Sequence, residues 1–329
     1  MTRGTKLGGG ALLLTVVCLG SWLLVGDSSL SIRLRRHLPR VVRKWLAPKP
    51  TPSPRMANLP NLYLWAWQRP EDLRFLSEKF PHQKIGVAFL AQTVYLMPSL
   101  AASSPKFIFP DSSFFDTARV NIRPRLQPLR VSPDTPLMAV VRIESAHGES
   151  LATFPNPASV LATISHQDIT FFAHQIATSA QIQGVSALQI DFDATLSEHA
   201  FYRDLLIEVR KQLPSNFPLS ITALASWCIG DRWLTGLPPG TIDEAVAMFF
   251  RMGSGTREVT SYLANGKNFT VPACSTSLGL STDESFSLDI LSGKLSVSDA
   301  PLSSLRVYVF SPHAWTETEA TPLLKELAP

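Results

Sequence analysis

Apolar, β-branched runs alternate with helix-like segments from Leu59 to the end of the chain, and this alternation constrains the fold more than any other feature. Eight runs are strand candidates: 62–67, 84–90, 137–143, 187–192, 219–224, 245–250, about 275–280 and 305–310. Strands that alternate with helices build parallel sheets, and eight units in about 270 residues predict an α/β fold, a (β/α)8 TIM-like barrel. An open doubly wound sheet is the alternative, but no GxGxxG or Walker sequence supports a nucleotide site.

Capping signals indicate where several helices begin. Arg69-Pro70-Glu71-Asp72 puts a proline and two acids in a first helical turn. Residues 165–168 and 195–198 resemble capping boxes, and 316–327 predicts a closing helix. The helix after residue 195 should bury one stripe, formed by Phe201, Leu205, Val209 and Leu213.

The first 57 residues differ from the rest. Residues 1–26 place two basic residues before an uncharged run of about twenty, which predicts a signal anchor or signal peptide, and the absence of a convincing cleavage site favours the anchor. Residues 27–57 predict a basic amphipathic segment that lies on a membrane surface, then a proline-rich linker. The barrel domain is expected over 58–329, with an insertion near 92–131 that forms a loop or a hairpin.

Charge separates these two parts of the chain. Residues 1–56 hold ten Lys or Arg and one acid, which leaves 20 basic and 25 acidic residues in 57–329. A main domain with a net charge near −5 argues against a nucleic-acid partner. We expect a membrane-anchored protein with its domain on the extracytoplasmic (periplasmic) side. The positive charge after the apolar run favours the cytoplasmic alternative under the positive-inside rule.

Three cysteines give neither a disulfide framework nor metal-ligand spacing. Cys228 and Cys274 can pair if they meet in space, and two buried free thiols are the favoured interpretation. No strong metal motif occurs, so we predict no metal and no cofactor.

The strongest functional signal is Asp191 with Asp193, at the end of the run 187–192. Successive strand side chains point to opposite faces, so Gln189, Asp191 and Asp193 share one face. Two acids at the end of an apolar strand are costly to bury, and their repulsion raises the pKa of one of them. A raised pKa is what a general acid at neutral pH needs.

Other candidate residues follow the remaining strands, where the working face of a barrel lies. Carboxylates and arginines there can hold hydroxyls and transfer protons, while indole rings can stack on sugar C–H faces. Each residue also has a structural interpretation: the tryptophans as core, Arg142 with Glu144 as an ion pair, Arg251 as a counter-charge to the aspartates, and His313 as a surface residue. The candidates are Trp65, Trp67, Arg142, Glu144, Trp227, Asp231, Arg251, Asp283, Glu284, His313 and Trp315.

Four blocks, 189–195, 202–205, 220–228 and 250–253, resemble a bacterial family catalogued as domain of unknown function 3142. The resemblance covers roughly 58–315 and implies a barrel related to glycoside hydrolases, with no established activity. Asp191-Phe192-Asp193 is also distantly similar to the fourth strand of chitinase-type glycosidases, which ends in Asp-aromatic-Glu. Asp193 stands at the position of their acid Glu, and Gln189 at that of an earlier Asp. A second alignment puts Thr195 at the acid position and excludes this mechanism.

These observations predict a membrane-tethered barrel that acts on a polysaccharide or oligosaccharide. In this hypothesis Asp193 donates the proton, Asp191 adjusts the pKa of Asp193 and orients the substrate, and Glu144 or Glu284 is a second carboxylate. Substrate would bind at Trp65, Trp67, Arg142, Trp227, Asp231, Arg251 and Glu284. The alternatives are a non-catalytic carbohydrate-binding barrel and a membrane-tethered scaffold for a protein partner, the latter favoured if Arg251 clamps both aspartates.

Overall fold

The computed structural model describes residues 51–97, 119–145, 164, 166–231, 233–265, 269–295, 297 and 301–327. The chain divides into two compact units, 1–49 and 50–329, and the description below concerns the second. No helix among the described residues is long and apolar enough to cross a membrane. The predicted anchor at 1–26 and most of the basic segment lie outside the described residues.

Eight parallel strands close into a barrel, which confirms the predicted fold class. β1 pairs with both β11 and β3, so the sheet has no open side at these strands. Every one of the eight overlaps a run expected from the sequence. They are β1 (Leu62–Ala66), β3 (Ile85–Met97), β6 (Leu137–Ser145), β7 (Val185–Asp191), β8 (Leu219–Leu224), β9 (Glu244–Met248), β10 (Ser277–Ser281) and β11 (Arg306–Phe310).

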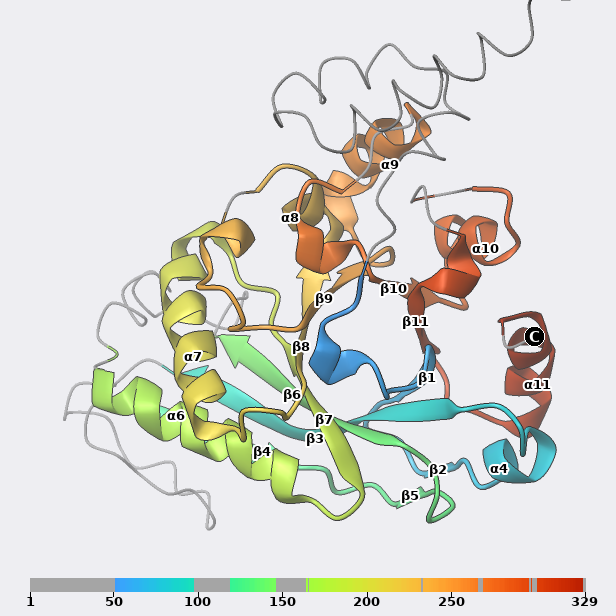
Figure 1. Cartoon of the computed structure of the whole chain (residues 1–329), viewed down its shortest axis with the longest axis horizontal. Coiled ribbons are helices and arrows are strands. Elements are labelled where there is room, and N and C mark those ends of the chain that lie inside the picture. Colours follow the sequence, from blue (N-terminus) through green and yellow to red (C-terminus); the bar gives the residue numbers. More distant parts are fainter. Residues whose placement is uncertain are drawn as a thin grey trace, which may run out of the picture. The chain divides into compact units, whose positions relative to one another are not determined.

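Helices cover the outside of the barrel (Figure 1). The capping box predicted at Thr195 and Glu198 is present, and it opens the short 3-10 helix η4 (Leu196–Glu198) that leads into α7. All four residues of the predicted α7 stripe are buried. The helices are α4 (Phe75–Lys79), α6 (His166–Thr178), α7 (His199–Gln212), α8 (Ala225–Ile229), α9 (Thr256–Ala264), α10 (Ser285–Leu291) and α11 (Glu317–Leu327).

The helix start predicted at residues 69–72 is wrong. Glu71 and Asp72 form the short strand β2, which pairs with β5 (Leu129–Arg130), and the helix α4 begins only at Phe75. Tertiary contacts override the local signal, because buried Glu71 forms an ion pair with Arg125 at 3.3 Å. Its other oxygen accepts the backbone N–H of Trp315 at 3.3 Å.

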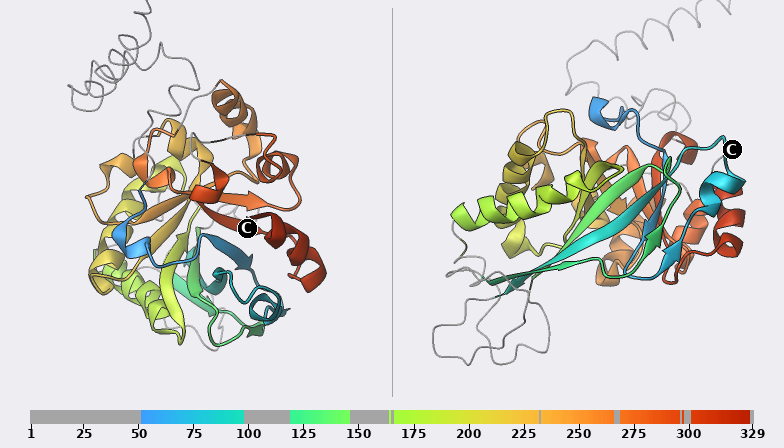
Figure 2. Two further views of the ribbon diagram at one scale, coloured as in Figure 1. Left: turned by 45° about the vertical axis from the view of Figure 1, so that its right-hand side comes forward. Right: turned by 90° about the horizontal axis from the view of Figure 1, so that it is seen from below.

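Two strands within the region of the predicted insertion pair with each other. β4 (Arg119–Pro124) runs antiparallel to the second half of β3, from Gln92 to Met97, and residues 98–118 between them lie outside the described residues. Figure 2 (right view) shows β3, β4 and β6 running past the other strands. Because β3 and β6 stay paired as far as Leu96 and Ser145, the sheet continues beyond the carboxyl end of the barrel as a wall.

Alternate side chains fill the interior of the barrel with large rings. Tyr63 and Tyr308 stack with ring centroids 5.1 Å apart, and Trp65 stacks on Tyr308 at 5.5 Å. The chain makes room for Tyr63 with Gly86, where an added Cβ would lie 2.3 Å from the tyrosine ring. A side chain at residue 86 would therefore displace the ring from the core.

A polar network crosses this interior. Glu244 is fully buried and receives Arg306 Nη1 at 2.7 Å and the Tyr308 hydroxyl at 2.7 Å. Ser220 Oγ also donates to Glu244 and accepts from Gln189, whose amide oxygen accepts the Trp65 indole N–H at 2.9 Å. Gln189 therefore belongs to the interior network that supports the strand ends.

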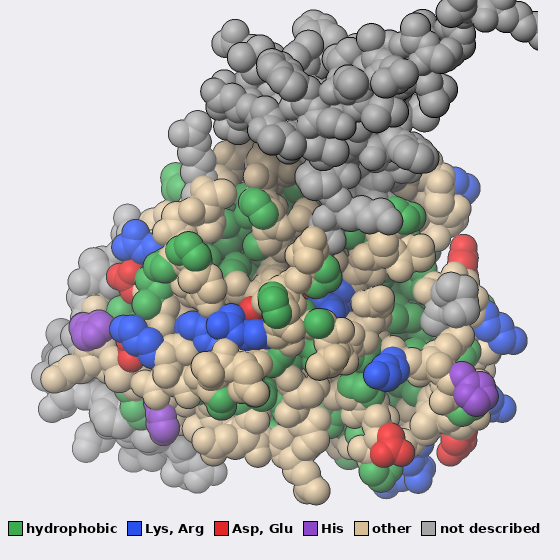
Figure 3. Space-filling model, viewed as in Figure 1, with side chains coloured by type: hydrophobic (Ala, Val, Ile, Leu, Met, Phe, Trp, Pro, Cys, Tyr) green, Lys and Arg blue, Asp and Glu red, His purple; other side chains and the backbone are tan. Residues whose placement is uncertain are grey.

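The amino-terminal end of the barrel is closed by η1 (Pro54–Met56), which Figure 1 shows in blue. Met56 is fully buried among the interior residues, and Arg306 donates to the carbonyl oxygens of Met56 and Pro60. Arg55 forms an ion pair with Asp243 at 2.9 Å. Figure 3 shows a band of Lys and Arg side chains across this face of the molecule.

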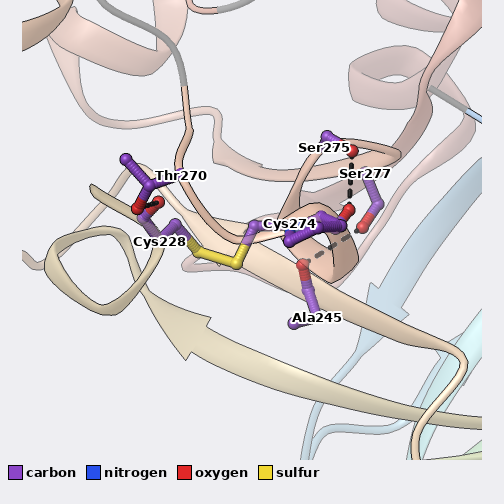
Figure 4. The surroundings of a disulfide bond; sticks show 7 residues. Cys228, Ala245, Thr270, Cys274, Ser275 and Ser277 are labelled. Atoms are coloured by element: carbon purple, nitrogen blue, oxygen red, sulfur yellow. Dashed lines mark hydrogen bonds between the residues drawn. A yellow bond between two sulfur atoms is a disulfide. The ribbon is translucent and has the colours of Figure 1, made fainter. Parts of the chain in front are cut away.

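Cys228 and Cys274 form a disulfide, so the expectation of two free thiols is wrong (Figure 4). Both residues are fully buried, and the bond joins α8, after β8, to the turn that precedes β10. Thr270 adds a backbone hydrogen bond to the Cys228 carbonyl at 2.8 Å. The sequence separation of 46 residues gave no signal that the two thiols meet.

Candidate active site

Arg142 joins three of the predicted site residues at the carboxyl ends of β1, β6 and β7. Its Nε donates to Glu144 Oε1 at 2.8 Å, and its Nη1 donates to Asp191 Oδ2 at 2.9 Å. Its guanidinium carbon lies 5.6 Å from the centroid of the Trp67 ring, within cation–π range. The register of β6 and β7 sets this geometry, because Arg142 stands directly opposite Asp191.

Asp191 is held on both sides. One carboxylate oxygen receives Arg142, and the other accepts the Thr222 hydroxyl of β8 at 2.7 Å. Its side chain is almost fully buried. Charge-assisted hydrogen bonds of this kind fix a carboxylate in place, so Asp191 acts as a stationary negative charge at the end of β7.

Asp193 differs from its neighbour. It is exposed, and its carboxylate accepts no hydrogen bond from any residue that the structure describes. Although solvent reaches the side chain, the protein around it removes part of its hydration. This desolvation, followed by the charge of Asp191, raises the pKa of Asp193 to about 6, and Arg142 opposes the shift. The two aspartates predicted as a pair therefore divide into one fixed charge and one carboxyl that can carry a proton near neutral pH.

This pKa shift predicts a pH-dependent stability difference. A carboxyl whose pKa is raised in the folded state favours folding at low pH, and the advantage is lost as pH rises from about 4 to 6. Asp193→Asn removes this pH-dependent loss of stability. Its free energy of unfolding should exceed that of the parent by about 1 kcal/mol at pH 7 and equal it at pH 3. The difference is small because solvent screens an exposed group. Urea unfolding at a series of pH values measures the difference, and a pH-independent difference would contradict the assignment.

Three partly exposed rings lie beside these carboxylates, and we call them the aromatic floor: Trp67, Phe250 and Phe310. Phe250 and Phe310 stack at 5.5 Å with their planes 4° apart. Trp67 meets Phe310 edge-on at 6.4 Å. The floor spans the ends of β9, β11 and β1, and it offers flat apolar surface next to hydrogen-bonding groups.

Arg251 lies at the far side of the aromatic floor and does not neutralise the aspartates. Its guanidinium lies over the Phe310 ring at 5.7 Å and 3.6 Å from Asp283. Its backbone has φ of 53°, in the left-handed region that side chains rarely adopt, and Glu284 accepts its N–H at 2.8 Å. On each side of the floor an arginine thus lies over a ring with a carboxylate beside its guanidinium, and on this side a second carboxylate, Glu284, binds the arginine backbone.

The other predicted tryptophans lie in the core. Trp65 is 4% exposed beneath the floor, and Trp227 is 4% exposed against Trp233 and His199. Asp231 lies near this second cluster, with an oxygen 3.9 Å from His199 Nδ1. The structure therefore brings together Trp67, Arg142, Glu144, Asp191 and Asp193, with Arg251, Asp283 and Glu284 across the floor. Trp65 supports the floor from below, where it meets Phe250 edge-on at 5.9 Å. Trp227 and Asp231 belong to the separate cluster around His199.

Three further residues considered in the sequence analysis, Trp315, His313 and Thr195, make no contact with the aspartates among the described interactions. Trp315 is buried and donates its indole N–H to the Trp65 carbonyl at 2.9 Å. His313 is exposed. Thr195 serves in the capping box, where it donates to Glu198 at 2.8 Å.

Several residues near the site were not predicted from the sequence. On the wall, Thr93 stands in register with Arg142, and Tyr95 stands in register with Glu144. Partners in adjacent strands share a face, so Tyr95 extends the surface that carries Glu144. Tyr202 is fully buried, its hydroxyl has no hydrogen-bond partner among the described residues, and burial together with the charges of Asp191 and Asp193 raises its pKa.

No family model and no curated protein matches the chain. Among solved structures, it is similar to a protein assigned as chitinase A from Streptomyces coelicolor, with 12% identity, a TM-score of 0.44 and coverage of 81% of this chain and 97% of that one. It is also similar to the spore cortex-lytic enzyme SleL of Bacillus cereus, with 12% identity, a TM-score of 0.42 and coverage of 93% and 85%. The described residues include no group of three or more His, Cys, Asp or Glu that could hold a metal ion.

Proposed function

We propose that this protein is a glycan-active (β/α)8 barrel that works as a glycoside hydrolase, with Asp193 as the proton donor. The observation that carries the proposal is the division between the two aspartates. Arg142 and Thr222 occupy both oxygens of Asp191, whereas Asp193 is exposed with its pKa raised to about 6. A carboxyl with this pKa is protonated in part at neutral pH and can transfer its proton to a glycosidic oxygen.

The aromatic floor supports a sugar ligand. Trp67, Phe250 and Phe310 present ring faces and edges that suit sugar C–H groups. Arg142 and Glu144 at one side, and Arg251 with Glu284 at the other, are placed to hold hydroxyl groups. Glu144 is our candidate for the second carboxylate, since it shares Arg142 with Asp191.

Asp193→Asn tests the catalytic role. Turnover of a responsive glycan should fall about 10²- to 10⁴-fold, the usual contribution of a general acid, while the dissociation constant stays within about threefold. The screen uses the full chain with a panel of oligosaccharides, hydrolysis read by reducing ends and binding by calorimetry. Asp204→Asn, the same change on the exposed face of α7, is the matched control. Unchanged turnover in Asp193→Asn would refute the assignment.

A non-catalytic carbohydrate-binding barrel is the second candidate, and one observation favours it. Glycosidases of the usual type employ two carboxylates, but Asp191 and Glu144 are both bound to Arg142. In this case Asp193→Asn leaves glycan affinity largely intact and there is no turnover to lose. The same screen therefore separates the two candidates.

We also propose that the domain works outside the cytoplasm. The disulfide between Cys228 and Cys274 supports this placement, because buried structural disulfides form and persist in oxidising compartments. The apolar run at residues 7–26 would then hold the domain at the membrane.

A further inference from the structure

The charges around the aromatic floor do not balance. Two arginines flank the floor, and each lies beside two carboxylates. The Arg142 side chain pairs with both Asp191 and Glu144. The Arg251 guanidinium lies 3.6 Å from Asp283, and the second carboxylate, Glu284, accepts the Arg251 backbone N–H. Both guanidinium charges are therefore engaged within the protein. Asp193 adds a fifth carboxylate, whose oxygens accept no hydrogen bond within the described part of the chain.

Other cations near the site do not neutralise this excess of negative charge. Arg125 pairs with buried Glu71, and the charge of Arg69 also acts on Glu71. Arg123 lies on the outer strand of the wall, in register with Thr93, which puts it two strand spacings, about 10 Å, from Arg142. That separation is about a Debye length at physiological ionic strength, so solvent screens much of its charge at the aspartates.

Two titratable groups lie close enough to Asp191 to feel its charge. Burial is the main cause of the raised pKa values of Asp193 and Tyr202, and the charge of Asp191 adds to both, although Arg142 touches Asp191 directly. A negative field therefore persists at the end of β7 after its counter-charge is included. A ligand that brings positive charge to this place would be favoured, and one that brings carboxylates would be repelled.

We propose that the site selects glycans that carry free amino groups, the cationic amino-sugar oligomers and polymers. This inference rests on the proposed function and adds its substrate class. The aromatic floor takes the C–H faces of the sugar, and the carboxylates at its two sides accept the ammonium groups. Acetylated amino sugars lose the charge that these carboxylates recognise, and uronic acids carry the opposite one.

Calorimetric titration of the full chain at about pH 6, where amines are protonated, tests the selection with three probes of matched length: glucosamine, N-acetylglucosamine and galacturonic acid oligomers. At about 0.01 M ionic strength the glucosamine oligomer should bind about tenfold tighter than its acetylated counterpart. The advantage should largely vanish at about 1 M, where the Debye length is about 3 Å. Asp283→Asn should weaken the glucosamine oligomer about fivefold, the effect of about one near-surface charge contact, and weaken the acetylated one by no more than about twofold.

Asp289→Asn is the matched control, because it removes an exposed carboxylate of α10 that pairs with Lys294 instead of facing the floor. It should change none of the affinities by more than about twofold. Equal or tighter binding of the acetylated or the uronic oligomer would overturn the selection and leave the proposed function standing. Failure of every glycan to bind would overturn both.

Discussion

Replacing Glu244 by glutamine is expected to lower the free energy of unfolding by about 3–5 kcal/mol. Glu244 is fully buried inside the barrel, and its oxygens receive Arg306, Tyr308 and Ser220. Glutamine keeps the shape but removes the charge, so the Arg306 guanidinium stays in the interior without its counter-charge. Urea-induced unfolding followed by tryptophan fluorescence measures the loss.

Two further variants make this test specific. Adding Arg306→Met to Glu244→Gln should recover part of the loss, since no unpaired charge is then buried; the recovery is incomplete because Arg306 also binds the carbonyls of Met56 and Pro60. Glu317→Gln, which breaks an exposed pair with Lys79, should cost less than about 0.5 kcal/mol. Equal losses in Glu244→Gln and Glu317→Gln would contradict the role given to the interior pair.

Removing the disulfide is expected to cost about 4 kcal/mol, the chain-entropy value for a closed loop of this length. Serine replacing both Cys228 and Cys274 releases a loop whose ends are 46 residues apart in sequence. Each single substitution should cost as much, because it also breaks the bond. Unfolding in urea, with and without reductant, measures the effect, and reductant should change the parent alone.

A thiol count gives an independent check on the same bond. The chain has three cysteines, so the unfolded, unreduced parent should expose one reactive thiol, and three after reduction. Cys18→Ser should lower the first number to zero without changing the stability of the barrel. Three reactive thiols before reduction would show that the pair is not bonded.

The fold could be predicted from the sequence because its signal is repeated and local. Eight apolar runs at regular intervals indicate parallel strands, and each run overlaps a strand of the barrel. The error at residues 69–72 has a specific cause. A proline and two acids meet the local criteria for a helix start, whereas the partners that draw Glu71 into β2, Arg125 and Trp315, lie 54 and 244 residues away.

The site could be predicted in part, because strand ends on one face of a barrel must lie near one another. That reasoning placed Arg142, Glu144, Asp191 and Asp193 at the site, but it could not choose partners. Strand register decides them: β6 pairs with β7, so Arg142 reaches Asp191. Arg251 follows β9, whose neighbour β10 leads into Asp283 and Glu284, so it pairs there instead.

Extending the strand alternation by one step would have found the missing rings. Val246 and Tyr308 point into the barrel, so Phe250 and Phe310, four and two residues further on, share their faces. The disulfide could not be predicted in this way, because the sequence separation of two cysteines carries no information about their distance in space.

The short helix η1 makes the two ends of the barrel different, because it closes the amino-terminal end. Ser53 and Arg55 bind Asp243, and Met56 enters the interior at the end of the barrel opposite Asp191 and Asp193. The aromatic floor lies at that opposite end, so a ligand bound there would not meet the segment 53–56 that closes the barrel.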